Sequence, residues 1–144
     1  MDASKDSGDG RGRGATKRSA KSIIVIDDEP DCCEVVAAAI EAGGRGRWRV
    51  RAFTDPIRAL AAFTAEKADL VVTDLSMPWI DGEDVVAAVR LRHPRVAALL
   101  ISARPGAPEA ARRLDVDLLV KPFEPKDLIR VVQRLLGENG AQEN

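Results

Sequence analysis

Residues 22–28, with the sequence SIIVIDD, decide the fold: a short apolar run ends in two adjacent carboxylates. The pattern returns at residues 70–74, LVVTD, where a second apolar run ends in an aspartate. Short runs rich in Val, Ile and Leu, without alternating polar residues, are typical of strands buried on both faces. Both segments are therefore predicted to be interior strands of a parallel sheet.

Apolar runs of this kind recur along the chain and are separated by helical patterns. The predicted strands are residues 22–26, 48–53, 70–73, 96–101 and 116–120. The first predicted helix begins at Pro30 and stops at Gly43–Gly44, and the second begins at Pro56. The third spans 82–92, the fourth spans 108–114, and the fifth runs from Pro125 to Gly137. Regular alternation of strand and helix implies right-handed crossovers with helices on both faces of the sheet. The predicted fold class is α/β, a five-stranded parallel sheet in a doubly wound (βα)5, flavodoxin-like three-layer sandwich.

Composition limits the domain organisation and the classes of partner. The 144 residues fit one domain, predicted at 22–137, between a disordered basic tail at 1–21 and a disordered C-terminal tail at 138–144. A formal net charge of −1 argues against a nucleic-acid binder that uses its whole surface. No apolar run approaches the roughly 20 residues of a membrane span. The two cysteines are adjacent and form no disulfide framework, so a cytoplasmic protein is expected.

The polar residues that follow the strands are the candidates for a site. Ligands of open α/β sheets bind beyond the carboxyl ends of the strands. Those ends carry Asp27 and Asp28, then Asp74, then Ser102, and finally Lys121. Crowded carboxylates repel one another unless a cation compensates them, and an oxygen-only site of this kind suits Mg²⁺. A carboxylate beside Mg²⁺ and a lysine can attack phosphorus and form an acyl phosphate.

Four motifs then carry a resemblance to a known family. They are Ile26-Asp27-Asp28-Glu29, Asp74-Leu75-Ser76-Met77-Pro78 with Asp81-Gly82, Ile101-Ser102-Ala103, and Lys121-Pro122-Phe123. In this order and spacing they resemble the motif set of the response-regulator receiver domains of two-component signalling. The resemblance covers about residues 22–136, which is nearly all of the predicted domain.

The resemblance implies a role for each matching residue. Asp74 would accept a phosphoryl group from a phosphohistidine on a sensor histidine kinase or a phosphotransfer protein. Mg²⁺ would be held directly by Asp28, Asp74 and the main-chain carbonyl of Ser76, and through water by Asp27. Lys121 would contact the phosphoryl group, and Ser102 would swing in to hydrogen-bond it. The Lys121-Pro122 peptide bond would be cis.

Two departures from the family pattern bear on how such a domain would signal. Receivers usually carry Tyr or Phe three residues before the motif lysine, and here that residue is Leu118. The segment 103–114 is short and contains Pro105 and Pro108, which predicts a reduced fourth helix. Signalling through a modified face is therefore expected. Ser76 and Arg104 are expected to tune hydrolysis of the phosphoryl group, in a direction that the sequence does not give.

The leading functional hypothesis is a stand-alone receiver with Mg²⁺ as its cofactor and a downstream protein as its target. It would be an enzyme only in catalysing its own phosphorylation and slow hydrolysis. One alternative is a receiver-like scaffold that binds partners without phosphorylation. Another is a nucleic-acid adaptor that uses residues 1–21 and Arg45, Arg47, Arg49 and Arg51, although charge on an edge strand explains these arginines more simply. A phosphatase or mutase is disfavoured, because Ser76 stands where a second acid is usual. Neither membrane nor nucleic acid is expected as a partner.

Overall fold

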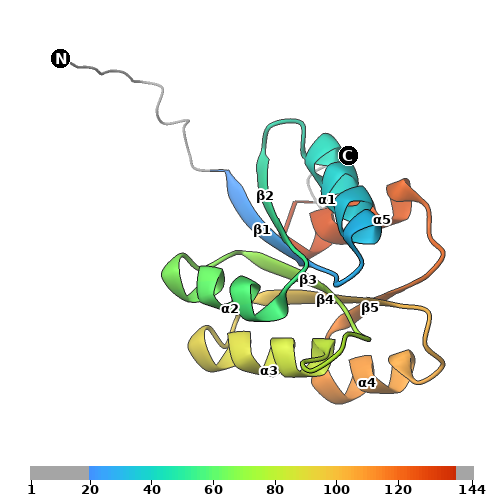
Figure 1. The fold of residues 1–144 in the computed structure, drawn as a ribbon. Helices are drawn as coiled ribbons and strands as arrows, with labels where there is room; N and C mark the ends of the chain where they lie inside the picture. Colours follow the sequence, from blue (N-terminus) through green and yellow to red (C-terminus); the bar gives the residue numbers. More distant parts are fainter. Residues whose placement is uncertain (1–19, 139–144) are drawn as a thin grey trace.

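A computed structural model describes residues 20–138. Five parallel strands form one sheet in the order β2-β1-β3-β4-β5, with α1 and α5 on one face and α2, α3 and α4 on the other (Figure 1). The predicted fold class is confirmed. The elements are β1 (Lys21–Ile26), α1 (Pro30–Gly44), β2 (Trp48–Phe53), α2 (Pro56–Ala65), β3 (Leu70–Asp74), α3 (Gly82–Arg92), β4 (Ala97–Ser102), α4 (Ala107–Leu114), β5 (Asp117–Val120) and α5 (Pro125–Leu135).

The two predicted tails fall mainly outside the described residues. Of the basic tail at 1–21, residues 1–19 lie outside them, and β1 begins at Lys21, one residue earlier than predicted. Of the C-terminal tail at 138–144, only Glu138 is described. Its carboxylate accepts hydrogen bonds from Trp48 Nε1 at 3.1 and 3.2 Å and from Arg47 at 2.6 Å. Residue 138 therefore packs onto the domain beside β2.

The register of the interior strands places their carboxyl ends side by side. Ile26 of β1 lies opposite Thr73 of β3, so Asp27 and Asp74 leave the sheet at the same level. Asp74 lies opposite Ile101 of β4, and Ser102 lies opposite Val120 of β5. Every strand is parallel, so all of these residues lie along one edge of the sheet.

Both faces of the central strands are buried, as the unbroken apolar runs predict. Ile23 and Val25 of β1 pack with Ile40 of α1 and Leu128 of α5 on one face. Ile24 and Ile26 face the other side, where they pack with the α2 and α3 residues Phe63 and Val85. Successive strand residues thus supply opposite layers of the core.

The end of α1 agrees with the prediction. The helix ends at Gly44 and is followed by the C-cap residue Arg45, which has a φ of 49°. A Cβ on Gly43 would lie 2.4 Å from Ile129 Cδ1, and one on Gly44 would lie 2.8 Å from the Trp48 side chain. Besides ending the helix, these glycines therefore allow close packing of α1 on α5 and β2, which the sequence pattern did not indicate.

β2 is an edge strand, as its alternating arginines predict. Arg49 and Arg51 form ion pairs with Glu66 just after α2, and Arg47 pairs with Glu138. Their guanidinium groups are thus engaged with carboxylates of this chain. Within residues 20–138, no helix combines the length and the apolar character that crossing a membrane requires.

α4 is as short as predicted, and its buried residues all have small side chains. They are Ala107, Ala110 and Ala111, and the half-buried Leu114 packs against the same cluster. Its carboxyl end is fixed from the neighbouring helix α3, because the Arg90 guanidinium donates hydrogen bonds to the carbonyl oxygens of Leu114 and Asp115, the latter at 3.1 Å. A cation at this end also complements the helix dipole.

Replacing Arg90 with methionine is expected to lower the free energy of unfolding by about 1–3 kcal/mol, because two carbonyl groups lose a charged donor. Urea denaturation measures the change. Arg92→Met is the matched control, since Arg92 is an exposed arginine in the same last turn of α3. Equal stability of the two variants would contradict a specific role for Arg90.

Candidate functional site

Three carboxylates meet where β1 and β3 leave the sheet. Asp27 and Asp28 directly follow β1, and Asp74 is the last residue of β3. One carboxylate oxygen from each lies within 4.8 Å of the others. Asp27 is the most enclosed, with 5% of its side chain exposed, and Asp74 exposes 12%. The structure thus brings together the acids that the sequence assigned to one edge.

Lys121 reaches this cluster from the end of β5. Its Nζ lies 3.5 Å from Asp74 Oδ1 and 3.6 Å from Asp27 Oδ2. Its backbone N–H donates to the carbonyl oxygen of Ser102 at 3.0 Å, which ties the start of the β5–α5 loop to the end of β4. The Lys121-Pro122 peptide bond is cis, as the resemblance implied. One ammonium therefore serves two carboxylates.

Burial and charge act on the protonation of this cluster. Burial raises the pKa of the Asp74 carboxyl, the charge of Asp27 raises it further, and Lys121 offsets only part of the increase. Burial alone would lower the pKa of Lys121, but the negative charges of Asp74 and Asp27 outweigh it and raise the pKa. The carboxylates are thus not fully compensated by the lysine, which favours a further cation among them.

The donor set fits a hard divalent cation. All of the gathered side-chain ligands are carboxylate oxygens, as Mg²⁺ prefers, and the cluster contains neither imidazole nor thiolate. The fit rests on the crowding and burial of three acids around one lysine.

Ser102 lies at the end of β4, is buried, and makes its hydrogen bond within its own loop. Its Oγ accepts a hydrogen bond from the backbone N–H of Arg104 at 3.0 Å. No hydrogen bond joins Ser102 to Asp74 in the described part of the chain. The register of β3 and β4 therefore places Ser102 next to the acid cluster. Its side chain, however, is hydrogen-bonded to the backbone of Arg104 and not to the cluster.

The loop after β3 is held close to the sheet. The Gly82 N–H donates to the carbonyl oxygen of Leu75 at 2.9 Å, and a Cβ on Gly82 would lie 2.6 Å from the carbonyl oxygen of Asp74. Asp81 and Asp84 form a reciprocal capping box that starts α3. Only glycine permits this approach, so Gly82 helps to fix the backbone of Asp74.

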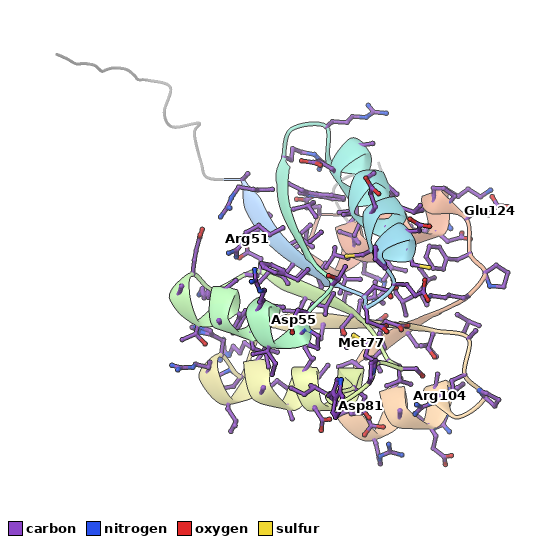
Figure 2. The ribbon with its side chains drawn as sticks, viewed as in Figure 1. Arg51, Asp55, Met77, Asp81, Arg104 and Glu124 are labelled. Carbon is purple, nitrogen blue, oxygen red and sulfur yellow. The ribbon has the colours of Figure 1, made fainter. Side chains whose placement is uncertain are left out.

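A contact between two loops at this edge was not predicted. The Arg104 guanidinium donates to Ser76 Oγ at 3.1 Å and so connects the loop after β4 with the loop after β3. Figure 2 labels Asp81 at the start of α3 and Arg104 in the loop before α4. The spacing of the motifs placed Ser76 and Arg104 near the site, but the sequence does not show how far the long side chain of Arg104 reaches.

Leu118, the departure from the family pattern, lies in β5. It is half-buried and packs against the cluster that contains Leu100, Ala107 and Ala111. The neighbouring Val120 exposes 54% of its surface. A leucine therefore occupies the space between β5 and the alanine face of α4.

Comparison with known proteins shows the family. Residues 23–133 match the response regulator receiver domain. The transcriptional regulatory protein PrrA of Mycobacterium leprae is 34% identical over 127 residues, which are 85% of this chain and 53% of that protein. The response regulator protein FleR of Pseudomonas aeruginosa is 30% identical over 118 residues, which are 80% of this chain and 24% of that protein. The chain thus spans about half the length of the first of these relatives and less of the second.

Solved structures show the same fold. The chemotaxis protein CheY4 of Vibrio cholerae has a TM-score of 0.73 at 24% identity, over 81% of this chain and 99% of that one, a likeness of fold alone. The receiver domain of the sensor histidine kinase PA1611 of Pseudomonas aeruginosa, solved with a magnesium ion in its active-site cleft, has a TM-score of 0.73 at 26% identity, over 83% of this chain and 99% of that one. The motifs, the sheet order and these matches agree, and the chain belongs to the response regulator receiver domain family.

Proposed function

We propose that this receiver domain takes a phosphoryl group onto Asp74 from the phosphohistidine of a sensor kinase or phosphotransfer protein, with Mg²⁺ bound, and that this changes its affinity for a downstream target. The observation that carries the proposal is the cluster of Asp27, Asp28 and Asp74 with the Lys121 ammonium 3.5 Å from Asp74. Burial and the neighbouring acids disfavour the ionised form of Asp74, so the cluster has an energetic cost for the folded protein. A site that accepts a phosphoryl group requires a carboxylate, a divalent cation and a lysine together, which explains why the acids are gathered there.

The chemistry follows from the positions of the groups. An Asp74 oxygen attacks phosphorus as the bond to the donor nitrogen breaks. Bound Mg²⁺, held directly by Asp28, Asp74 and the Ser76 carbonyl and through water by Asp27, would neutralise charge on the phosphoryl oxygens. Lys121 offsets the same charge from the side of β5. The magnesium ion described for the PA1611 receiver supports this assignment.

The switch would begin at Ser102. To hydrogen-bond a phosphoryl group on Asp74, its hydroxyl would turn toward Asp74 and donate the proton that the bond from the Arg104 N–H does not use. That movement would act on the β4–α4 loop, and α4 would follow readily because its buried residues are all alanines. The stand-alone form and the cytoplasmic location stay predictions.

Intact mass spectrometry tests the proposal. Incubation with acetyl phosphate and Mg²⁺ is expected to add one phosphoryl group to the wild-type protein and none to Asp74→Asn. Asp127→Asn is the matched control, since it removes a partly exposed carboxylate on α5, and it is expected to behave like the wild type. No addition to the wild type, or undiminished addition to Asp74→Asn, would refute the proposal.

A phosphorylation-independent scaffold is the second candidate, and one observation favours it. Leu118 offers no aromatic ring or hydroxyl to follow Ser102, and it already packs against α4. Binding of a co-purified partner separates the two functions. Equal affinity of the wild-type protein with and without phosphodonor, matched by Asp74→Asn, would support the scaffold.

A further inference from the structure

Trp79 projects from the loop between β3 and α3, at the edge of the sheet that carries Asp74. It exposes 98% of its surface and has a φ of 71°. The Ile80 N–H donates to the Pro78 carbonyl oxygen at 2.8 Å, so Trp79 is the central residue of a γ-turn with positive φ. Such a turn is rare and strained, and bulky residues seldom adopt it. A lone exposed apolar side chain is ordinary on a protein surface, but one held in a strained turn is not.

The residues on both sides of Trp79 hold this turn in place. Met77 is buried and Ile80 is half-buried, and both pack in the cluster that contains Phe63 of α2 and Val85 of α3. The loop is thus fixed to the core while the indole of Trp79 points into solvent. This arrangement favours burial of the indole by another molecule, and Trp is among the residue types most enriched as interface anchors.

The surface around Trp79 is acidic. Asp55 precedes α2, Asp81 precedes α3, and Asp84 lies in the first turn of α3. Figure 2 labels Asp55 and Asp81 at the starts of these two helices. A surface that receives the indole would therefore combine an apolar pocket with positive charge.

The chain itself presents such a pocket at the opposite edge of the sheet. A cavity of about 370 Å³ lies between the loop that precedes β3 and the loop that precedes β4. Ala68, Pro94 and Val96 contribute apolar lining, and Lys67 and Arg95 contribute positive charge. The cavity therefore has the two properties that the surroundings of Trp79 require of a partner.

The charges of this pocket are available to a partner. Within residues 20–138, no carboxylate forms an ion pair with Lys67 or Arg95, and both side chains are exposed. Asp69 also lines the cavity, but its carboxylate accepts a hydrogen bond from the Ser22 N–H at 2.8 Å. Leu91, in the last turn of α3 just before the lining loop, exposes 87% of its surface and adds apolar area at this edge.

We propose that one copy of this chain inserts Trp79 into the pocket between Lys67 and Arg95 of a second copy. The inserted side chain and the receiving pocket lie at opposite edges of the sheet, so each copy can use both. The contact is therefore heterologous, and association does not stop at two copies. The inference does not rest on the proposed function, because the contact needs neither Mg²⁺ nor a phosphoryl donor.

Sedimentation velocity of the full-length protein without phosphodonor tests this inference. The weight-average mass of the wild type is expected to rise with concentration beyond that of a dimer, and to rise less in high salt because opposite charges meet. Trp79→Gly accepts the positive φ without strain and is expected to weaken association about thirtyfold or more, as for loss of a Trp anchor. Lys67→Glu combined with Arg95→Glu is expected to weaken it comparably.

Mixing the two variants separates this contact from a symmetric one. Trp79→Gly keeps the pocket and the double variant keeps Trp79, so an equimolar mixture is expected to form a dimer that grows no further. Lys126→Glu with Arg130→Glu, at two exposed positions of α5, is the matched control and is expected to associate like the wild type. All substituted side chains are exposed, and thermal midpoints check that each variant is folded. A monomeric wild type, a symmetric dimer, or a mixture that stays monomeric would overturn this inference and leave the proposed function standing.

Discussion

Replacing Asp74 with asparagine is expected to stabilise the metal-free protein at neutral pH, although Asp74 is the proposed acceptor. Burial and the charge of Asp27 raise the pKa of this carboxyl, so its ionised form is disfavoured in the folded state. Asparagine keeps the shape and removes the charge. The expected gain in unfolding free energy is on the order of 1 kcal/mol.

The pH dependence of this gain has a definite sign. A raised pKa means that the folded protein keeps the Asp74 proton to a higher pH than the unfolded chain does. The contribution of Asp74 to stability therefore falls as pH rises from the unfolded to the folded pKa, and the full penalty is present above the latter. The advantage of Asp74→Asn is expected to vanish in acid, where the carboxyl is protonated in both states.

Magnesium is expected to make the wild type more stable than Asp74→Asn, which reverses their order in the absence of the ion. At a free concentration one hundred times its Kd, an ion that binds only the folded state adds about 2.7 kcal/mol. Asp74→Asn removes one proposed direct ligand and is expected to lose most of that gain. The variant is thus more stable than the wild type in chelator and less stable in Mg²⁺.

Urea denaturation with chelator and with Mg²⁺ measures this crossover. Asp127→Asn makes the same change of charge away from the cluster and is expected to respond to Mg²⁺ like the wild type. A sodium salt at matched ionic strength controls for screening. Equal responses of the wild type and Asp74→Asn to Mg²⁺ would refute the proposed ligand role of Asp74.

Gly82→Ser is expected to cause the other large effect, a loss of about 3 kcal/mol of unfolding free energy. The new Cβ would lie 2.6 Å from the carbonyl oxygen of Asp74 and 2.9 Å from the Cα of Leu75, and backbone atoms cannot turn away as a side chain can. The displacement falls on the residue that carries the proposed function. A lower yield of phosphorylated protein is therefore expected as well.

Gly106→Ser is the matched control for Gly82→Ser. Gly106 precedes α4, has a negative φ, and has no atom within 4 Å of the position of an added Cβ. Serine is also well accepted at such a helix start. Thermal unfolding of the two variants side by side checks the contrast, and similar losses would contradict the steric explanation.

The sheet and most of the site were predictable from sequence for one physical reason. Unbroken apolar runs mark strands buried on both faces, and parallel strands present their carboxyl ends along one edge. Once the register aligned Ile26 with Thr73, Asp27 and Asp74 had to leave the sheet together. Order along the chain was thus sufficient to predict which acids meet.

Features that depend on close packing were not predictable in the same way. Gly43 and Gly44 end α1 as their pattern predicts, but the pattern did not show that Ile129 and Trp48 fill the space of their missing side chains. The bond from Arg104 to Ser76 depends on the reach of a flexible side chain between two loops. Such contacts depend on the three-dimensional arrangement of side chains, which a pattern along the sequence does not contain.

Mapping the phosphorylated residue tests the central claim most directly. After reaction with acetyl phosphate and Mg²⁺, borohydride reduction converts an aspartyl phosphate to homoserine, and peptide mass spectrometry locates it. The account predicts homoserine in place of Asp74, at a yield that falls sharply when Mg²⁺ is chelated. Homoserine at another carboxylate such as Asp27 or Asp28, or no homoserine at all, would contradict it.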